Sequence, residues 1–536
     1  MDRIVIVGSG ASGVHFALSA LRKNYQVTMI DVGYEKPDPV NRDDTFTTLK
    51  ENLSDPAAYF LGERYQGVLL PGSEKEYYGI PPNKDYVFRS PDDFHYQSRG
   101  FAPLFSFAQG GLAEAWTAGC YPFNDDELSD FPFGYKEIAP YYAEVARRIG
   151  IGGAADDLAR IFPVHDHLLD PLELDRHSAL LLAEYRKHAS YLNRRLRCFL
   201  GRTRVATLSQ DVEGRQKCTY LGRCLWGCPR ESLYTPSLTL AQCRENPNFT
   251  YIPRMRVRHF KFSSGNRITN LIAEPTDGGS TREFPVDKLV LAAGALCSSK
   301  IFLDSICKNT GEIIQLRGLM DNRQLLVPFV NLRLIGQPFN PDSYQYHQVG
   351  LGIETENPKE YVHGQITTLK TAMLHPIIQS LPCDMRTAIF LVRNFHCALG
   401  IVNLNLHDTR REANYLTLEE NAGAGNTRMI INYSSAHEQK AQIQRSLKTV
   451  KKVLRRLGCL VPPGMAQVRP MGASVHYAGT LPMSPAKTPL TTSEYCQSHD
   501  FDNLYVIDGA TFPFLPAKNI TFTLMANAIR VAETAF

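Results

Sequence analysis

The sequence lacks an excess of charge of either sign, and it lacks a long hydrophobic run. Its 536 residues include 58 basic and 54 acidic ones, which gives a formal net charge of +4. A balance this close disfavours nucleic acid or an anionic membrane as the main partner and favours a small molecule. No window approaches the roughly 18 consecutive apolar residues of a membrane-spanning helix, so we expect no transmembrane segment.

The chain also lacks internal repeats and low-complexity tracts. With 536 residues, of which 43% are hydrophobic, it can form two or more cores, so we expect at least two structural regions. It opens directly on an apolar strand pattern, MDRIVIVGSG, without a basic leader, which predicts a cytoplasmic protein. In a reducing compartment, clustered cysteines indicate metal or redox chemistry more often than disulfides.

The first segment, RIVIVGSGASGVHFALSALRKNYQVTMID, combines an apolar strand, a glycine-rich turn, a helical pattern and a second strand. This is the order of a dinucleotide-binding unit. Gly8 permits the tight turn, Gly10 lets the backbone approach a pyrophosphate, and Gly13 lets the helix pack on the strand. Asp31 ends the second strand, where an acid can accept hydrogen bonds from the ribose. The fingerprint predicts a dinucleotide site without separating NAD from FAD.

Two later segments have a similar strand-to-turn pattern. In DKLVLAAGALCSSKIFLDS, an apolar strand breaks at Gly294 and a helix follows. In NLYVIDGATFPFLPAKNITFTLMANAIRVAE, a strand leads to Asp508 and Gly509, and a proline-rich loop precedes a helix from about Thr521. Both segments are typical of further strands in the sheet that carries the dinucleotide site.

This C-terminal segment and the glycine element Gly8–Gly13 resemble the glucose-methanol-choline (GMC) oxidoreductases, FAD enzymes that oxidise alcohols. The segment SVHYAGTLPMS matches their His-x-x-Gly-Thr pattern at His476, Gly479 and Thr480. The order of the motifs along the chain makes the resemblance specific. It implies the following cofactor-binding residues: Gly8, Gly10, Ala11, Ser12, Gly13, Asp31, Gly110, Gly111, Thr117, Gly294, Asp508, Gly509, Asn519 and Thr521.

The segment SFAQGGLAEAWTAGC, Ser106 to Cys120, resembles the loop that covers the flavin in this family, particularly in the pyranose oxidase branch. In that branch, a histidine two residues before the threonine can bind the flavin covalently. Here Ala115 stands at that position, so the resemblance implies that FAD is held non-covalently. It also implies that Thr117 lies near flavin N5.

Alcohol oxidation by hydride transfer requires a base for the hydroxyl proton, a group that orients the oxygen, and flavin N5 as acceptor. By resemblance, His476 is the base and Asn519 the orienting group. A neutral imidazole is available at cytosolic pH because its ordinary pKa is about 6.5. The helix after Asn519 would direct its N-terminal dipole at flavin N1 and O2, where negative charge gathers on reduction.

Three cysteines, Cys218, Cys224 and Cys228, lie within KCTYLGRCLWGCPRE. Zinc would need a fourth ligand, and no matching second cysteine pair lies nearby. Closely spaced thiolates on a loop that ends in Cys-Pro are also a feature of iron–sulfur sites. The spacing is similar to that in the FAD-dependent glucose dehydrogenase branch, which implies ligands of a three-iron, four-sulfur cluster. The alternative is a structural loop with small buried thiols.

The motifs predict an α/β protein, α+β overall, of the GMC type. A discontinuous Rossmann-like FAD-binding domain comprises residues 1–125, 201–305 and 465–536. Residues 126–200 and 306–464 form a substrate domain built on an antiparallel sheet. Within it, a capping box at Ser435 and Glu438 predicts the start of a helix that Gly458 ends. Asp125, Asp126 and Glu127 favour a solvated turn or helix start.

Together these features indicate an FAD-dependent dehydrogenase that oxidises a hydroxyl group of a sugar or sugar-like compound by hydride transfer to flavin N5. Amino sugars and glycosides are among the candidate substrates, and a redox protein is one candidate electron acceptor. One alternative is an oxidase of the same fold that uses oxygen and has structural cysteines. A second alternative, from another class of protein, is a catalytically silent flavoprotein that senses redox state.

Overall fold

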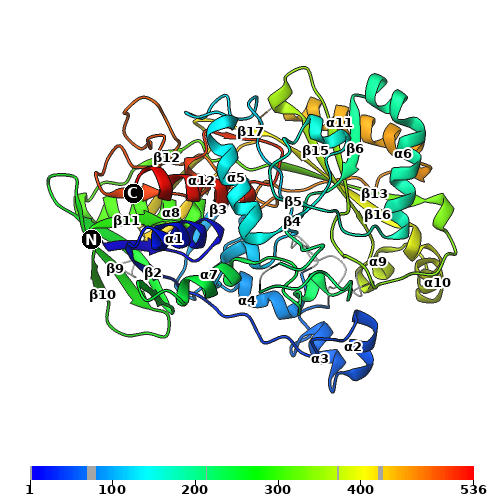
Figure 1. Cartoon of the computed structure of the whole chain (residues 1–536), viewed down its shortest axis with the longest axis horizontal. Helices are drawn as coiled ribbons and strands as arrows, with labels where there is room; N and C mark the ends of the chain where they lie inside the picture. The colour runs from blue at the N-terminus through cyan, green and yellow to red at the C-terminus, as the bar shows by residue number, and fades with distance from the viewer. Residues whose placement is uncertain (1–2, 69–79, 213, 371–373, 421–426, 437) are drawn as a thin grey trace.

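The computed structural model describes residues 3–68, 80–212, 214–370, 374–420, 427–436 and 438–536. Two sheets lie at opposite ends of the long axis of the molecule (Figure 1). Both termini are at the end with the parallel sheet, and the ring of Phe536 packs edge-on against Phe16 of the first helix. None of the helices in these ranges is both long and apolar enough to cross a membrane.

The first sheet has five parallel strands in the order β22-β11-β1-β2-β7. Their bounds are β1 Arg3–Val7, β2 Gln26–Ile30, β7 Phe249–Ile252, β11 Lys288–Leu291 and β22 Leu504–Val506. Side chains alternate along β1, so that Ile4 and Ile6 enter one core and Val5 and Val7 another. Both faces are therefore buried, as parallel sheets require.

Helices cover both faces of this sheet. Helices α1, α7 and α12 pack together on the face of Ile4 and Ile6, and α5 packs on α12. Helix α8 and the three-stranded sheet β8–β10 cover the other face. The bounds are α1 Ala11–Arg22, α5 Tyr135–Ile149, α7 Pro236–Arg244, α8 Ala295–Thr310, α12 Thr521–Thr534, β8 Met255–Phe262, β9 Ile268–Pro275 and β10 Arg282–Pro285. This arrangement confirms the predicted Rossmann-like unit.

The second large sheet is antiparallel, in the order β20-β13-β16-β15-β14-β6, with β21 also paired to β13. The bounds are β6 Cys198–Arg202, β13 Arg323–Asn331, β14 Val349–Ile353, β15 Val362–Thr368, β16 Leu399–Leu406, β20 Cys459–Leu460 and β21 Gln467–Val468. Helices α6 (Arg176–Arg195) and α11 (Gln439–Arg456) pack on its apolar face. The opposite face carries polar side chains, among them His363, Gln365 and Asn405.

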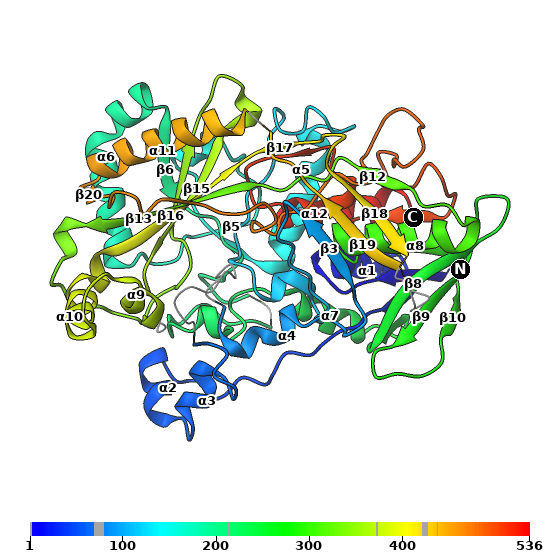
Figure 2. The same ribbon diagram turned by 180° about the vertical axis from the view of Figure 1, so that it is seen from behind.

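A four-stranded sheet, β12-β18-β19-β3, lies beside α8, as Figure 2 shows from behind. Its strands are β3 Tyr96–Arg99, β12 Gln315–Arg317, β18 Tyr415–Glu420 and β19 Thr427–Asn432. Leu416, Leu418 and Ile431 share the core of the parallel sheet. The two-domain division of the sequence stays a proposal, and three of these strands, β12, β18 and β19, belong to 306–464 but pack against the dinucleotide half.

The remaining elements are short or peripheral. Helices α2 and α3 project from one side of the molecule (Figure 1). The bounds are α2 Phe46–Asn52, α3 Pro56–Leu61, α4 Asp85–Phe88, α9 His375–Ser380, α10 Met385–Phe395, β4 Ile151–Gly152, β5 Leu168–Leu169, β17 Asp408–Thr409 and β23 Phe514–Leu515.

The predicted capping box at Ser435 is wrong. Helix α11 begins at Gln439 and its N-cap, Glu438, makes no side-chain capping hydrogen bond. The Ser435 hydroxyl instead accepts a hydrogen bond from Arg323 at the start of β13. The position of Gly458 just beyond the helix is as expected, with a φ of +79°. A charged donor from a distant strand has replaced the local capping partner.

Candidate active site

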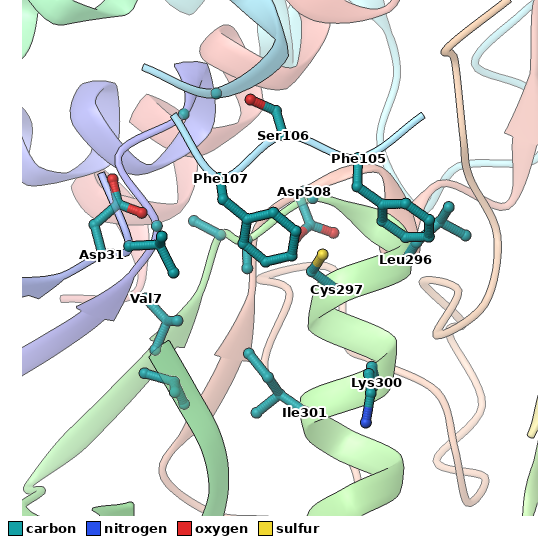
Figure 3. A pocket seen from close by; sticks show the side chains of 18 of the residues that line it. Val7, Asp31, Phe105, Ser106, Phe107, Leu296, Cys297, Lys300, Ile301 and Asp508 are labelled. Carbon is teal, nitrogen blue, oxygen red and sulfur yellow. The ribbon is translucent and has the colours of Figure 1, made fainter. Parts of the chain in front are cut away.

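A cavity of about 460 Å³ opens at the carboxyl ends of the parallel strands. In such sheets this edge is where ligands bind. Figure 3 shows Asp31, Asp508 and residues of α8 around the cavity, with the segment Phe105–Phe107 running along its upper edge in this view. Twelve residues that the sequence singled out line the cavity: Gly8, Gly10, Ala11, Ser12, Asp31, Gly110, Gly111, Gly294, His476, Asp508, Gly509 and Thr521.

The glycine-rich turn is too closely packed for side chains at two positions. Gly8 has a φ of +98°, and a Cβ there would lie 2.7 Å from the carbonyl oxygen of Ala292. A Cβ on Gly13 would lie 2.2 Å from the carbonyl oxygen of Gly8. Helix α1 therefore begins close to β1. Its N-cap is Gly10, which has no side chain that could occupy the amides of the first turn. These amides face the cavity as a phosphate-binding helix start does, so the residues present fit FAD.

Asp31 follows β2 and is held by two neighbours. The Ser9 hydroxyl and the Tyr251 hydroxyl, the latter at 3.2 Å, both donate to Asp31 Oδ2. Ser9 Oγ in turn accepts from the Gly110 amide at 2.9 Å. Burial raises the pKa of Asp31 to about 6, and the hydrogen bonds partly oppose that shift. The acid thus lies where the sequence predicts a ribose partner, and Ser9 connects it to the loop of Gly110.

Asp508 connects β22 to the start of α8. The Ser298 hydroxyl donates to Asp508 Oδ2 at 2.5 Å, and the Ala510 amide donates to Oδ1 at 3.0 Å. Burial raises the pKa of Asp508 to about 6. Ser298 Oγ also accepts from the Ala293 amide at 3.1 Å. The carboxylate thereby fixes the turn that contains Gly294 against the C-terminal segment.

His476 lines the cavity, and Asn519 lies beside it. Asn519 Nδ2 is 3.3 Å from His476 Nε2, and Asn322 Oδ1 is 2.9 Å from His476 Nδ1. Gln365 Nε2 donates to Asn519 Oδ1 at 2.6 Å. Burial lowers the pKa of His476 to about 4, so its imidazole is neutral at neutral pH. A neutral ring beside an amide donor can accept a proton from a hydroxyl group.

Three predicted cofactor residues lie outside the lining of the cavity. Gly13 packs beneath the glycine turn, and Thr117 and Asn519 are half-buried nearby. The segment of Thr117 approaches the pair of His476 and Asn519, because a Cβ on Gly119 would lie 3.1 Å from Asn519 Oδ1. The structure thus brings the covering loop to Asn519, while the position of Thr117 relative to a flavin stays a prediction.

The polar face of the antiparallel sheet forms a roof over this end of the site. His363 lies two residues before Gln365 on β15 and therefore on the same face, and Asn405 is its cross-strand partner on β16. Within the described residues, His363 Nε2 and both amide atoms of Asn405 are buried without a hydrogen-bond partner. Burial lowers the pKa of His363 well below its ordinary value, and His347, Lys518 and His476 add repulsion. The roof thus offers neutral donors and acceptors.

A buried ion pair holds the loop of Asn519. Lys518 Nζ donates to Glu127 Oε2 at 2.5 Å and to the carbonyl oxygens of Pro122 and Ile161 at 2.8 and 3.1 Å. Both charged side chains are fully buried. The prediction of a solvated turn is confirmed for Asp125 and Asp126, which are exposed, and is wrong for Glu127. Its partner lies 391 residues away, so no local pattern reveals it.

Cys218, Cys224 and Cys228 have free thiols. Cys224 is buried and the other two are half-buried, all packed against the core of the parallel sheet. Burial raises the pKa of Cys218 to about 11 and that of Cys224 well above its usual range. Across the described ranges, no group of three or more His, Cys, Asp or Glu side chains could hold a metal ion. As arranged, the three thiols do not fit an iron–sulfur cluster.

Several residues around the site were not predicted, among them Tyr251 at Asp31, Lys518 beside Asn519, and Asn322 and Gln365, which contact His476 and Asn519. Lys518 directly precedes Asn519, and the mostly apolar segment around these two residues was the only sequence signal for burial. Asn322 directly precedes β13 and Gln365 lies within β15, both in the antiparallel sheet, and no sequence motif marks either residue.

The chain matches known proteins in both sequence and fold. A family model described as GMC oxidoreductase matches residues 410–528. Paromamine 6'-oxidase from Streptomyces fradiae is 21% identical over 99% of this chain and 90% of its own length. 2-Methyl-1,2-propanediol dehydrogenase from Mycolicibacterium austroafricanum is 22% identical over 99% of this chain and 94% of its own.

Among solved structures, pyridoxine 4-oxidase from Mesorbium loti has a TM-score of 0.62 at 17% identity and covers 99% of both chains. This likeness supports the fold, and the family model covers the segment that carries His476 and Asn519. The family model, the curated relatives and the fold together support the glucose-methanol-choline (GMC) oxidoreductase family and an FAD-dependent oxidoreductase that acts on CH–OH donors.

Proposed function

We propose that the protein is an FAD-dependent dehydrogenase that oxidises a hydroxyl group of a sugar or sugar-like compound. The observation that carries the proposal is the pairing of Asn519 with His476, with Asn519 Nδ2 3.3 Å from Nε2 of His476, which lines the same cavity as the dinucleotide fingerprint. A base and a hydroxyl-orienting amide at that position are what alcohol oxidation requires.

FAD, when bound, supplies the hydride acceptor. We propose that Gly8, Gly10 and the start of α1 hold its pyrophosphate and that Asp31 holds its ribose. At the other end, Ile520 and Thr521 of the α12 N-terminus line the cavity. The positive end of this helix dipole would stabilise the negative charge that the cofactor gains.

His476 is the proposed proton acceptor. Its ring is neutral because burial lowers its pKa to about 4, so the Nε2 lone pair can take the substrate hydroxyl proton. Asn519 cannot titrate, and its amide can donate to the substrate oxygen once that oxygen lies beside His476. In this proposal His476 takes the proton and Asn519 orients the substrate oxygen.

The polar roof supports a polyhydroxylated substrate. His363 and Asn405 present buried polar atoms without partners in the described chain, and buried polar groups need partners. Several hydroxyl groups on one small molecule would provide them. The names of the curated relatives, a paromamine 6'-oxidase and a diol dehydrogenase, agree with hydroxylated substrates.

Anaerobic reduction of the bound flavin by a panel of aldoses, amino sugars, glycosides and simple diols tests the proposal. We expect flavin bleaching by at least one polyhydroxylated compound. His476→Ala should keep FAD bound and lose the bleaching, whereas His95→Ala, at an exposed histidine, should behave as wild type. Bleaching of equal rate in His476→Ala would contradict the assignment of the base.

An oxygen-using oxidase is the second candidate, favoured by the names of paromamine 6'-oxidase and pyridoxine 4-oxidase. Turnover with oxygen alone, compared with turnover with artificial acceptors under anaerobic conditions, separates the two. Rapid hydrogen peroxide formation at air saturation would favour the oxidase. The pair of His476 and Asn519 argues against a catalytically silent flavoprotein, which would show neither flavin bleaching nor peroxide formation with any substrate.

For the electron route, we propose direct transfer from the cofactor to an external acceptor. An iron–sulfur relay would require Cys218, Cys224 and Cys228 to converge, and they form no metal-holding group within the described chain. Iron and labile-sulfide assays on anaerobically purified protein check this, and we expect neither in stoichiometric amount. About three irons per chain, lost in Cys228→Ser, would overturn the proposed route.

A further inference from the structure

Asn322 is a fully buried residue directly before β13, in contact with the ring of His476. Its Nδ2 donates to the carbonyl oxygens of Leu406 and Pro516, both at 2.9 Å. A carbonyl oxygen can only accept a hydrogen bond, so the amide nitrogen must lie on that side. The orientation of the Asn322 amide is therefore fixed by the main chain, and its Oδ1 faces His476.

This orientation determines which nitrogen of His476 carries the proton. Asn322 Oδ1 lies 2.9 Å from Nδ1 and can only accept, so Nδ1 must bear the hydrogen and Nε2 the lone pair. On the other flank, Asn519 Nδ2 lies 3.3 Å from Nε2, which agrees with the same tautomer. The Asn519 and Gln365 amides could turn over together, whereas Asn322 cannot. Asn322 is thus the anchor of the chain of hydrogen bonds.

The preceding residue, Asp321, holds the main chain of the same loop. Its carboxylate accepts from the Gly472 amide at 2.6 Å and from the Ser474 hydroxyl, and Ser474 Oγ accepts from the His476 amide at 3.0 Å. Between them, Val475 has a φ of +64°, unusual for a β-branched residue. Two adjacent residues thus constrain the backbone and the ring of His476.

We propose that Asn322 is a positioning residue that fixes the Nδ1–H tautomer of His476, so that Nε2 is available as the proton acceptor. This inference rests on the proposed function of His476 as the base. The group acts through His476 and does not itself take the proton. The same ring with its hydrogen on Nε2 would present a donor to the substrate hydroxyl and could not accept its proton.

The test compares two substitutions of Asn322 in the holoenzyme. Asn322→Asp keeps an acceptor toward Nδ1, and Asn322→Leu removes it. Asn503 provides a matched control: it is buried, its Nδ2 donates to the carbonyl oxygens of Ile268 and Asp287 at 2.9 and 3.0 Å, and Asn503→Leu removes a similar amide away from the site. Thermal unfolding and FAD content of the three variants report structural damage.

The direct readout is the ¹⁵N spectrum of histidine-labelled oxidised holoenzyme, with His476 assigned by its loss in His476→Gln. We expect a protonated Nδ1 and an unprotonated Nε2 in wild type and in Asn322→Asp. In Asn322→Leu we expect the two forms to mix. A wild-type His476 protonated at Nε2, or an unaltered tautomer in Asn322→Leu, would overturn the proposal.

Anaerobic flavin reduction gives a second readout. Since general-base catalysis contributes about 100-fold or more, Asn322→Leu should slow reduction by on the order of 100-fold and Asn322→Asp by less than about tenfold. Asn503→Leu should reduce its flavin at the wild-type rate. If Asn503→Leu and Asn322→Leu slowed flavin reduction equally, a loss of stability would explain the slower rate, and the inference would be contradicted. Normal reduction in His476→Gln would refute the proposed base instead, while the spectrum still decides the tautomer.

Discussion

The pKa of His476 is determined by the burial of its ring. The transfer of an imidazolium ion out of water is unfavourable, and burial lowers the pKa of His476 to about 4. The folded enzyme therefore keeps the neutral ring over most of the pH range in which a free histidine is partly charged. A base whose pKa is low is a weak one, so its efficiency depends on correct placement beside the substrate hydroxyl and the cofactor.

We predict that kcat/KM for the reducing substrate falls on the acid side near pH 4 to 5, well below the ordinary histidine pKa of about 6.5. The sign follows from the shift: protonation inactivates the base, and the depressed pKa postpones it to lower pH. Stopped-flow flavin reduction from pH 4 to 8 measures this. The buried ring also makes the free energy of unfolding decrease as the pH falls from about 6.5 towards about 4. In this range His476 binds a proton more readily in the unfolded chain than in the folded protein.

Asp321 is a group next to the loop of His476 that also titrates in this range, since burial raises its pKa to about 7. Its carboxylate binds Ser474 and Gly472 on the loop of His476. An inflection near pH 7 that disappears in Asp321→Asn would belong to this carboxylate. A single inflection near 6.5 that disappears in His476→Gln would contradict the depressed pKa.

The loop before α12 carries Asn519, and the side chain of the preceding residue, Lys518, anchors this loop. All three Lys518 donors are used, on Glu127 and two carbonyl oxygens. Burial lowers the pKa of Lys518 and raises that of Glu127, and each charge opposes the shift of the other. The carbonyl oxygens of Pro122 and Ile161 add two hydrogen bonds to the Lys518 side chain, so neutral as well as charged partners hold the loop.

Lys518→Met should destabilise the protein by about 3–5 kcal/mol, because it leaves the Glu127 carboxylate buried and unpaired. Since the anchor of Asn519 is lost, flavin reduction should slow even where the variant is folded. The double variant Lys518→Met with Glu127→Leu should regain part of the stability. Urea unfolding measures all three proteins, and a single variant as stable as the double would refute the argument.

The start of α1 offers a matched pair of glycine substitutions. Gly13→Ala would place a Cβ 2.2 Å from the Gly8 carbonyl oxygen and so push the helix off β1. A Cβ on Gly10 meets only the Ala292 carbonyl oxygen, at 3.9 Å, and projects into the cavity. We predict that Gly13→Ala loses about 1–3 kcal/mol of stability. Gly10→Ala should fold normally and bind FAD more weakly.

Fluorescence quenching of added FAD and thermal unfolding of the apoprotein measure the two effects separately. A Gly10→Ala protein with wild-type FAD affinity would mean that the pyrophosphate does not approach this turn. A Gly13→Ala protein of unchanged stability would show that α1 can move away from β1 without cost.

The parallel sheet could be predicted because its strands end in recognisable turns. Residues Gly8, Asp31, Gly294 and Asp508 each follow an apolar run, and parallel strands bring their carboxyl ends to one edge. The contacts around His476 could not be predicted in this way. Asn322 and Gln365 reach it from the antiparallel sheet, and neither residue has a local pattern that distinguishes it from any buried amide.

Local signals failed where a distant partner competed for the same atoms. The Ser435 hydroxyl was available to cap a helix, but the guanidinium of Arg323 is a stronger partner and holds it instead. Glu127 follows two exposed aspartates, and only the fold brings Lys518 beneath it. Both outcomes depend on which strands adjoin, which the local sequence does not specify.

The cofactor cavity joins segments from the first to the last element of the chain, from Gly8 to Thr521. A ligand in this cavity contacts β1, β2, the loop of Gly110, α8 and the start of α12 at once, and unfolding would separate all of them. Binding to the folded state alone must therefore stabilise the whole protein, by an amount that depends on the free ligand concentration.

We predict that removal of FAD lowers the unfolding temperature and that added FAD restores it in a concentration-dependent way. At a free concentration 100 times the Kd, the gain should be about 2.7 kcal/mol. NAD at the same concentration should give a smaller shift, which also checks the identity of the dinucleotide that the fingerprint alone cannot determine. Gly10→Ala apoprotein should need more FAD for the same shift. An apoprotein that unfolds at the same temperature with and without saturating FAD would mean that the cavity does not hold the cofactor in the folded state.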